Sequence, residues 1–154
     1  MANQDSLTVT RAHFIGIGGA GMSGIALVLH ERGCTVTGSD LKSSRYVREL
    51  EEAGIRVHIG HVAATIDEVR PDVVVTSSAI PETNPEVIRA RELGLPIWPR
   101  AKMLSYLSRG RKTIAVAGTH GKTTTSSMIA TMLDKMDLDP SFLIGGVVEG
   151  YDTN

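Results

Sequence analysis

The chain has 154 residues, of which 42% are apolar and 21% are charged, as in ordinary globular proteins with a buried core. The formal net charge of −1 argues against bulk binding to nucleic acid or to an anionic membrane surface. Cys34 is the single cysteine, which excludes a disulfide within one chain and a zinc site built on several thiols. The polar first residues do not resemble a signal peptide, and no segment approaches the roughly 20 apolar residues of a membrane span. We therefore expect a cytoplasmic protein.

Short β-branched runs alternate with segments of helical periodicity over the first hundred residues. Strands are predicted at residues 12–17, 34–38, 55–59, 72–76 and 95–98. Helices are predicted at residues 22–32, 44–53, 85–93 and 101–107, with Thr83 or Asn84 as a cap and Pro85 as a first helical residue. Such alternation predicts right-handed βαβ units. The expected fold class is therefore α/β, a Rossmann-like parallel sheet with helices on both faces.

A polar break at residues 108–111 predicts a domain boundary near Gly110, which separates a domain at 1–110 from an incomplete one at 111–154. The second part is predicted to begin with a strand at 113–117, a glycine turn and a helix from 122 to about 136. A further strand is expected after Pro140, ending near Gly145. This part corresponds to the first strand–P-loop–helix of a second α/β domain.

The predicted helix in this second part has an apolar face that nothing in the sequence covers. The face consists of Met128, Ile129, Met132 and Leu133. We therefore expect the chain to be a piece of a longer protein, and the exposed surface is a candidate contact for a homodimer.

The first glycine-rich segment reads Gly16-Ile17-Gly18-Gly19-Ala20-Gly21 and fits the pattern G-x-G-x-x-G. It follows a predicted strand and opens a predicted helix, the context in which such a loop binds a diphosphate. Glycines allow a close backbone approach, and the helix N-terminus offers free N–H groups. Asp40, at the end of the second strand, is placed to accept hydrogen bonds from ribose hydroxyls. The pattern alone does not separate NAD from other diphosphate nucleotides, and a tight turn without a ligand is the alternative.

The second glycine-rich segment runs from Val116 to Thr123 and resembles a P-loop, although Val116 stands where the pattern has its first glycine. Its backbone N–H groups would hold phosphates, Lys122 would reach the terminal phosphates, and the Thr123 hydroxyl would bind Mg²⁺. His120 either contacts the nucleotide or packs within the turn. The alternative is an ordinary strand–turn–helix with an exposed lysine.

Together the two loops and several short motifs resemble the Mur ligases that join L-alanine to UDP-N-acetylmuramate. The similar segments cover residues 12 to 154. They are 18–26 (GGAGMSGIA), 38–40 (GSD), 77–80 (SSAI), 84–86 (NPE), Arg100-Ala101, Met103-Leu104, 118–125 (GTHGKTTT), Gly145-Gly146 and Asn154.

The resemblance implies a set of site residues. The UDP-sugar would be bound by Gly18, Gly19, Ala20, Gly21, Met22, Ser23, Asp40, Ser77, Ser78, Ala79 and Ile80. ATP would be bound by Gly118, Thr119, His120, Gly121, Lys122, Thr123 and Thr124, with Lys122 and Thr123 as catalytic residues and Thr123 as a ligand of Mg²⁺.

The resemblance also implies the reaction, in which ATP hydrolysis drives amide formation through an acyl phosphate on the sugar's lactyl carboxylate. L-alanine would be held by a C-terminal domain that this chain does not include, so we expect UDP-sugar binding without ligase activity. Three alternatives remain: an NAD-dependent oxidoreductase domain, a non-enzymatic nucleotide-binding module, and the related ligase that attaches whole peptides to the same UDP-sugar.

Overall fold

The computed structural model describes residues 7–144 of the chain. The chain forms two compact units, Met1–Leu107 and Ser108–Asn154. Gly145, Gly146 and Asn154, which contribute to the sequence resemblance, lie outside the described residues.

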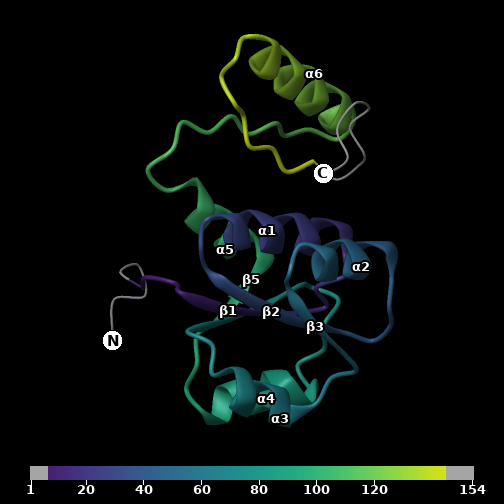
Figure 1. The fold of residues 1–154 in the computed structure, drawn as a ribbon, viewed down its shortest axis with the longest axis vertical. Helices are drawn as coiled ribbons and strands as arrows, with labels where there is room; N and C mark the ends of the chain where they lie inside the picture. Colours follow the sequence, from purple (N-terminus) through teal and green to yellow (C-terminus); the bar gives the residue numbers. More distant parts are fainter. Residues whose placement is uncertain (1–6, 145–154) are drawn as a thin grey trace. The chain divides into compact units, whose positions relative to one another are not determined.

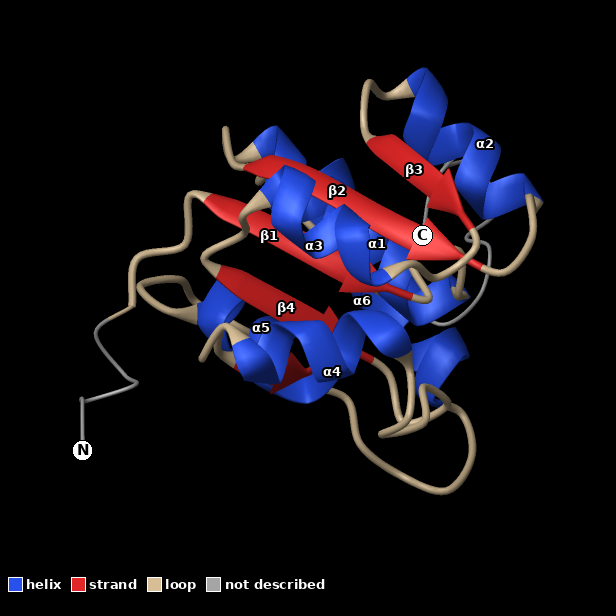
Figure 2. Ribbon diagram, turned by 90° about the horizontal axis from the view of Figure 1, so that it is seen from below, coloured by secondary structure: helices blue, strands red, loops and turns tan. Residues whose placement is uncertain are grey.

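The first unit is built on a parallel sheet of five strands, which Figure 2 shows from below. The strands are β1 (Arg11–Ile15), β2 (Thr35–Asp40), β3 (Arg56–Ile59), β4 (Val73–Thr76) and β5 (Ile97–Pro99). They lie in the order β3-β2-β1-β4-β5, and every neighbouring pair is parallel. The direction of winding reverses between β1 and β4, which is where open α/β sheets bind ligands.

Helices cover both faces of this sheet, as the sequence predicted (Figure 1). One face carries α1 (Ala20–Glu31), α2 (Arg45–Glu52) and α5 (Arg100–Ser108). The opposite face carries α3 (Ala63–Val69) and α4 (Pro85–Glu92). The Rossmann-like fold class is therefore confirmed.

Capping side chains explain why two of these helices begin where the sequence predicted. Asn84 Oδ1 accepts hydrogen bonds from the backbone N–H groups of Glu86 (2.9 Å) and Val87 (3.4 Å), and Pro85 is the first helical residue. Ser44 Oγ accepts from the N–H of Val47 at 3.3 Å at the start of α2. Helix α3 was not predicted. No side chain caps its start, and it ends at Arg70 in a left-handed conformation (φ 47°) rather than at a glycine.

The core of the first unit lies on both sides of β1 because alternate side chains point to opposite faces. Ala12 and Phe14 pack in the larger cluster with Met22, Ile25 and Leu29 of α1 and with strand residues, all buried. Ile15 packs on the other face with residues of α3 and α4. With both faces covered, the carboxyl ends of the strands and the loops that follow them are left as the place for a ligand.

The second unit contains helix α6 (Lys122–Lys135), close to the predicted bounds. The strand predicted at 113–117 is wrong: these residues are irregular, and among residues 7–144 they pair with no strand. The strand predicted after Pro140 is likewise absent through Ile144, and its expected end at Gly145 lies outside the described residues. A β-branched run adopts sheet structure only where a neighbouring strand bonds its N–H and C=O groups, and neither segment has such a neighbour.

The predicted apolar face of α6 is partly covered. Met128 and Met132 are exposed by 62% and 61%, whereas Ile129 and Leu133 are half-buried. Ala130 is buried against Ile144 and Phe142 from the segment after the helix. Across the described part of the chain, no helix combines the length and hydropathy needed to cross a membrane.

Candidate functional site

The first glycine loop joins the carboxyl end of β1 to the start of α1. Gly16 has a positive φ of 77°, which lets the chain turn at once after the strand. The N–H groups of Gly16 and Ile17 donate to the carbonyl of Ser39 on β2 (2.8 and 3.0 Å), which ties the loop to the neighbouring strand. The loop therefore stands at the edge of the sheet predicted for a ligand.

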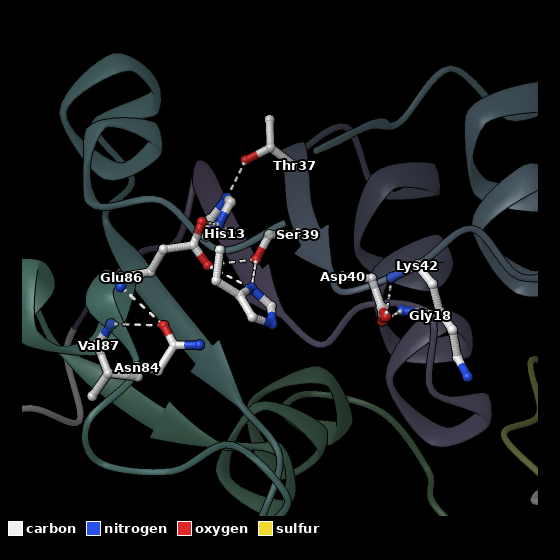
Figure 3. A network of polar contacts seen from close by, with 10 residues as sticks. His13, Gly18, Thr37, Ser39, Asp40, Lys42, Asn84, Glu86 and Val87 are labelled. Atoms are coloured by element: carbon white, nitrogen blue, oxygen red, sulfur yellow. Dashed lines mark hydrogen bonds and ion pairs between the residues drawn. The ribbon is translucent and has the colours of Figure 1, made fainter. Parts of the chain in front are cut away.

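Gly18 is held in a space that admits no side chain. A Cβ atom at this position would lie 2.8 Å from Cγ2 of Val47, 2.9 Å from Oδ2 of Asp40 and 3.0 Å from Oγ of Ser44. Its N–H donates to Oδ2 of Asp40 at 2.8 Å (Figure 3). The glycine is thus required by close packing of the loop on β2 and α2.

Asp40 holds the glycine loop in this structure. Oδ2 is occupied by Gly18, while Oδ1 receives only a long contact of 3.5 Å from the N–H of Lys42. If Asp40 binds the ribose, as the sequence predicts, Oδ1 is the atom available to accept the hydrogen bond. This ribose contact stays a prediction.

The segment of Ser77, Ser78, Ala79 and Ile80 follows β4 and lies beside the glycine loop. A Cβ on Gly16 would be 3.1 Å from Cδ1 of Ile80 and 3.9 Å from Oγ of Ser77. The N–H of Ala79 donates to Oγ of Ser77 at 3.3 Å, and Ser78 and Ala79 are exposed. The fold therefore brings together the predicted segments after β1 and β4, at the point where the strand order reverses.

Arg100 places a positive charge beside the glycine loop. The sequence prediction of the site did not include this residue. It begins α5 directly after β5, and a Cβ on Gly21 would overlap its guanidinium group. The positive side chain thus lies over the first turn of α1, whose N-terminus is itself partly positive, and a bound anion would favour both charges. An arginine that follows a strand at the ligand edge of the sheet is the signal that could have identified it.

The second glycine loop precedes α6 in the second unit. Gly118 and Gly121 both have positive φ values, 149° and 77°. Nζ of Lys122 donates to the carbonyls of Gly118 (2.5 Å) and Thr119 (3.3 Å), so the lysine folds back over its own loop. The seven predicted ATP-binding residues, 118–124, are all exposed.

The Thr123 hydroxyl is the kind of oxygen ligand that Mg²⁺ prefers. Within residues 7–144 no group of three His, Cys, Asp or Glu side chains is arranged to hold a metal. Thr123 thus suits the ion as one ligand among others.

A buried polar cluster lies on the α4 side of the sheet (Figure 3). The Ser39 hydroxyl donates to Oε2 of Glu86 at 2.5 Å, and Nδ1 of His61 lies 2.9 Å from Ser39 Oγ and 3.1 Å from the same Glu86 oxygen. On β1, Nδ1 of His13 is 2.9 Å from Oγ1 of Thr37. Sequence patterns did not reveal this cluster, because its members are single polar residues in four separate segments.

His13 and Glu86 face each other inside the protein with no exposed side-chain surface. Nε2 of His13 is 3.5 Å from Oε1 of Glu86, long for a hydrogen bond but close enough for an ion pair, and neither atom has a hydrogen-bonding partner. Burial raises the pKa of Glu86. The hydrogen bond from Ser39 and the nearby imidazoles of His13 and His61 outweigh that effect and hold the pKa below its ordinary value. Glu86 is therefore a buried, ionised carboxylate.

Sequence comparisons place these features among known proteins. Residues 11–112 match the Mur ligase family, catalytic domain. The chain is 52% identical to the UDP-N-acetylmuramate–L-alanine ligase of Persephonella marina and 53% identical to that of Legionella pneumophila, in each case over 95% of this chain and 31% of the relative. The chain thus spans about a third of the length of these curated relatives.

Solved structures agree with the sequence comparisons. The UDP-N-acetylmuramate–alanine ligase of Thermotoga maritima superposes with a TM-score of 0.85 at 34% identity, over 95% of this chain and 34% of that one. The UDP-N-acetylmuramate:L-alanyl-gamma-D-glutamyl-meso-diaminopimelate ligase from Neisseria meningitides gives 0.87 at 39% identity, over 95% and 46%. Because the family match covers well over half of the chain and runs through the glycine loop, this chain belongs to the Mur ligase family.

Proposed function

We propose that this chain forms the UDP-sugar-binding part of a cytoplasmic, ATP-dependent ligase that joins L-alanine to UDP-N-acetylmuramate in peptidoglycan precursor synthesis. One observation carries the proposal. The glycine loop, Asp40 and the segment at 77–80 meet at the carboxyl edge of the sheet, where the strand order reverses. The relatives from Persephonella marina and Legionella pneumophila, each more than 50% identical to this chain, bear the name of that ligase.

In this proposal the diphosphate lies at the start of α1. Within the loop at 18–23, the N–H groups of Ala20 and Gly21 face the diphosphate, since those of Gly18, Met22 and Ser23 already donate within the protein. Arg100 supplies a full positive charge beside Gly21. Asp40 faces the nucleoside through Oδ1, while residues 77–80 close the opposite side. The lactyl group of the sugar then extends from the diphosphate toward the rest of the enzyme.

The second unit would contribute the phosphate loop for ATP. Lys122 would leave the carbonyls of Gly118 and Thr119 to bind the terminal phosphates, and the Thr123 hydroxyl would be one ligand of Mg²⁺, which would neutralise phosphate charge. The lactyl carboxylate attacks the γ-phosphate and gives an acyl phosphate and ADP. The amine of L-alanine then attacks the acyl carbon, and phosphate leaves as the amide forms.

A second candidate is the ligase that attaches a whole peptide to the same UDP-sugar. The observation that favours it is the similarity to the Neisseria meningitides structure. Its TM-score and sequence identity to this chain are both slightly higher than those of the Thermotoga maritima ligase. Both candidates share the UDP-sugar site. They differ in the amine that they accept. An assay of the full-length enzyme with L-alanine and with the peptide L-alanyl-gamma-D-glutamyl-meso-diaminopimelate therefore distinguishes them.

The proposed UDP-sugar site predicts a ranking of ligands. In isothermal titration calorimetry, the chain should bind UDP-N-acetylmuramate and UDP, bind UMP more weakly, and show no binding of NADH. The diphosphate makes the charge-assisted contacts with the α1 N-terminus and Arg100, so a ligand with one phosphate loses part of them. Saturable binding of NADH, with none of UDP, would instead establish the oxidoreductase alternative.

For ATP we expect weak binding by this chain, at least about tenfold poorer than by a full-length relative. The loop at 118–124 is exposed throughout, and Lys122 must exchange two hydrogen bonds to loop carbonyls for contacts with phosphate. Calorimetry with ATP and Mg²⁺ measures the affinity, and Lys122→Met should abolish what remains, whereas Lys135→Met, at the far end of α6, should not. Tight Mg²⁺-dependent binding by the unchanged chain would contradict this expectation.

A further inference from the structure

The buried cluster around Glu86 is connected to the glycine loop through Ser39. The hydroxyl of Ser39 donates to Oε2 of Glu86, while its backbone carbonyl accepts the N–H groups of Gly16 and Ile17. Ser39 has no exposed surface, so water cannot substitute for either contact. A displacement of the Glu86 carboxylate therefore moves the residue that holds the start of the loop.

A second connection runs through His61 to Asp40. Nδ1 of His61 contacts both Ser39 and Glu86, and the preceding residue, Gly60, donates its N–H to the backbone carbonyl of Asp40 at 2.7 Å. The Asp40 carboxylate in turn receives the N–H of Gly18. Glu86 is thus linked by short contacts to both supports of the glycine loop, Ser39 and Asp40.

The hydrogen-bond directions assign where protons sit in the cluster. Because the Ser39 hydroxyl donates to Glu86, its oxygen accepts, and Nδ1 of His61 carries the hydrogen that points at Ser39 and Glu86. When His61 takes up a second ring proton, that proton therefore binds to Nε2. The His61 side chain is 10% exposed, whereas the side chains of His13 and Glu86 are fully buried, so protons exchange with solvent through His61.

We propose that Glu86 is a positioning residue of the nucleotide site, and that the cluster of Glu86, His13 and His61 couples proton uptake to nucleotide binding. The inference rests on the proposed UDP-sugar site. With both histidines neutral the cluster bears one negative charge, from Glu86, and the uptake of one proton makes it neutral. A diphosphate is an anion, so its binding favours proton uptake, and by linkage a lower pH favours its binding.

Other titratable groups lie on the elements that pack around His61. They include His13 on β1, Asp40 on β2, His58 on β3, Asp67 and Glu68 on α3, and Glu86 on α4, together with Glu92 on α4, which pairs with Arg89. Asp67 and Glu68 are paired with Arg89 and Arg56, respectively. His58 lies in register with Ser39 on the neighbouring strand, and its buried Nε2 has no hydrogen-bonding partner. The carboxylate that contacts His61 is therefore that of Glu86.

The pH interval for a test follows from Glu86. A carboxylate with a lowered pKa in the folded protein stabilises the fold above its unfolded pKa, and this stabilisation is lost only as the pH falls into the acid range. Histidines titrate between about pH 5 and 8. Measurements from about pH 6 to 8.5 therefore span the range in which histidine side chains in general change charge, while Glu86 remains ionised and the fold intact.

The experiment measures the affinity for UDP-N-acetylmuramate by calorimetry across this interval, since its diphosphate, esterified on both sides, does not titrate there. The affinity of the unchanged chain should rise by up to about tenfold from the highest to the lowest pH, the factor that corresponds to a difference of one unit between the free and bound midpoints. Glu86→Gln and His61→Gln should each bind more weakly at low pH and lose the dependence. The double variant should behave like either single one, because both remove the same coupling.

His30→Gln is the matched control, because His30 is a half-buried histidine on α1, outside the cluster, and this variant should keep the full pH dependence. The histidine ring signals in NMR spectra provide a second readout: addition of the ligand at constant pH should move the ring signals of His61 toward those of a protonated imidazole. A Glu86→Gln protein that is folded and retains the pH dependence would overturn the coupling, as would additive effects in the double variant. If the unchanged chain fails to bind at every pH, the proposed UDP-sugar site itself is wrong, whereas pH-independent binding refutes the coupling alone.

Discussion

Replacement of Gly21 by valine is expected to abolish binding of UDP-N-acetylmuramate while the fold remains intact. A side chain at this position projects from the first turn of α1 into the space of the Arg100 guanidinium. It would displace Arg100 and separate the helix N–H groups from the diphosphate. The loss of two charge-assisted hydrogen bonds costs about 3 kcal/mol or more, so affinity should fall on the order of a hundredfold at least.

The fold should tolerate this change because Arg100 is exposed and its side chain can move. A glycine inside a helix is also less favourable than other residues, by up to about 1 kcal/mol. Chemical denaturation should therefore show a free energy of unfolding that is not reduced. Gly18→Val is unsuitable for this test, since its side chain would meet Val47 and Asp40 in the packed interior.

Gly33→Ala is the control for an effect that acts through stability alone. Gly33 follows the end of α1 with φ 85°, and nothing lies near its Cβ position. Alanine there should lower the free energy of unfolding by about 1 kcal/mol through backbone strain and leave the affinity for the UDP-sugar unchanged. Unchanged affinity in Gly21→Val, or an equal loss in Gly33→Ala, would show that the glycine loop does not bind the diphosphate.

No L-alanine-dependent release of phosphate is expected from the purified 154-residue chain. Amide formation requires the sugar carboxylate, the γ-phosphate with its metal ion, and the amine to be held together. Positioning of reactants contributes roughly 7–11 kcal/mol of barrier reduction, a factor of at least about 10⁵ in rate. This chain corresponds to about a third of its relatives' length, and its second glycine-rich loop, at 118–124, is open to solvent.

The assay combines UDP-N-acetylmuramate, L-alanine and ATP with Mg²⁺ and measures phosphate with and without L-alanine. The full-length Legionella pneumophila relative, 53% identical over the shared region, is the positive control. The same chain should bind UDP-N-acetylmuramate in calorimetry, so inactivity is not explained by misfolding. Turnover by the chain that depends on L-alanine would show that the catalytic groups lie within these residues.

The sequence predicted the first glycine loop and its partners well, because each has a local chemical reason. Gly16 needs a positive φ, and Pro85 with Asn84 begins a helix through groups that are adjacent in the chain. The order of β-branched runs and helical segments was enough to predict a parallel sheet, and the carboxyl ends of parallel strands share one edge. From this, the proximity of the glycine loop to Asp40 and to Ser77 could be expected before the structure was known.

Other features had no local signal. Helix α3 has neither a capping side chain nor a terminal glycine, so nothing in its seven residues marks its ends. The run at 113–117 has the residues of a strand, but no strand neighbours it among residues 7–144, and β-propensity without a partner does not make a strand. These two errors have the same cause: packing against distant residues decides the outcome.

The sequence by itself therefore determined the fold class, the positions of the two glycine-rich loops and the family, since these depend on short motifs and on the order of elements. Only the tertiary structure showed that Asp40 bonds to Gly18, that Arg100 lies over Gly21, and that Glu86 is buried among His13, Ser39 and His61. The residues that these contacts join are separated by between 22 positions (Gly18 and Asp40) and 79 positions (Gly21 and Arg100) in the sequence. The energies of these contacts depend on burial and on hydrogen-bond geometry, which no residue carries alone and which exist only after the strands and helices have packed.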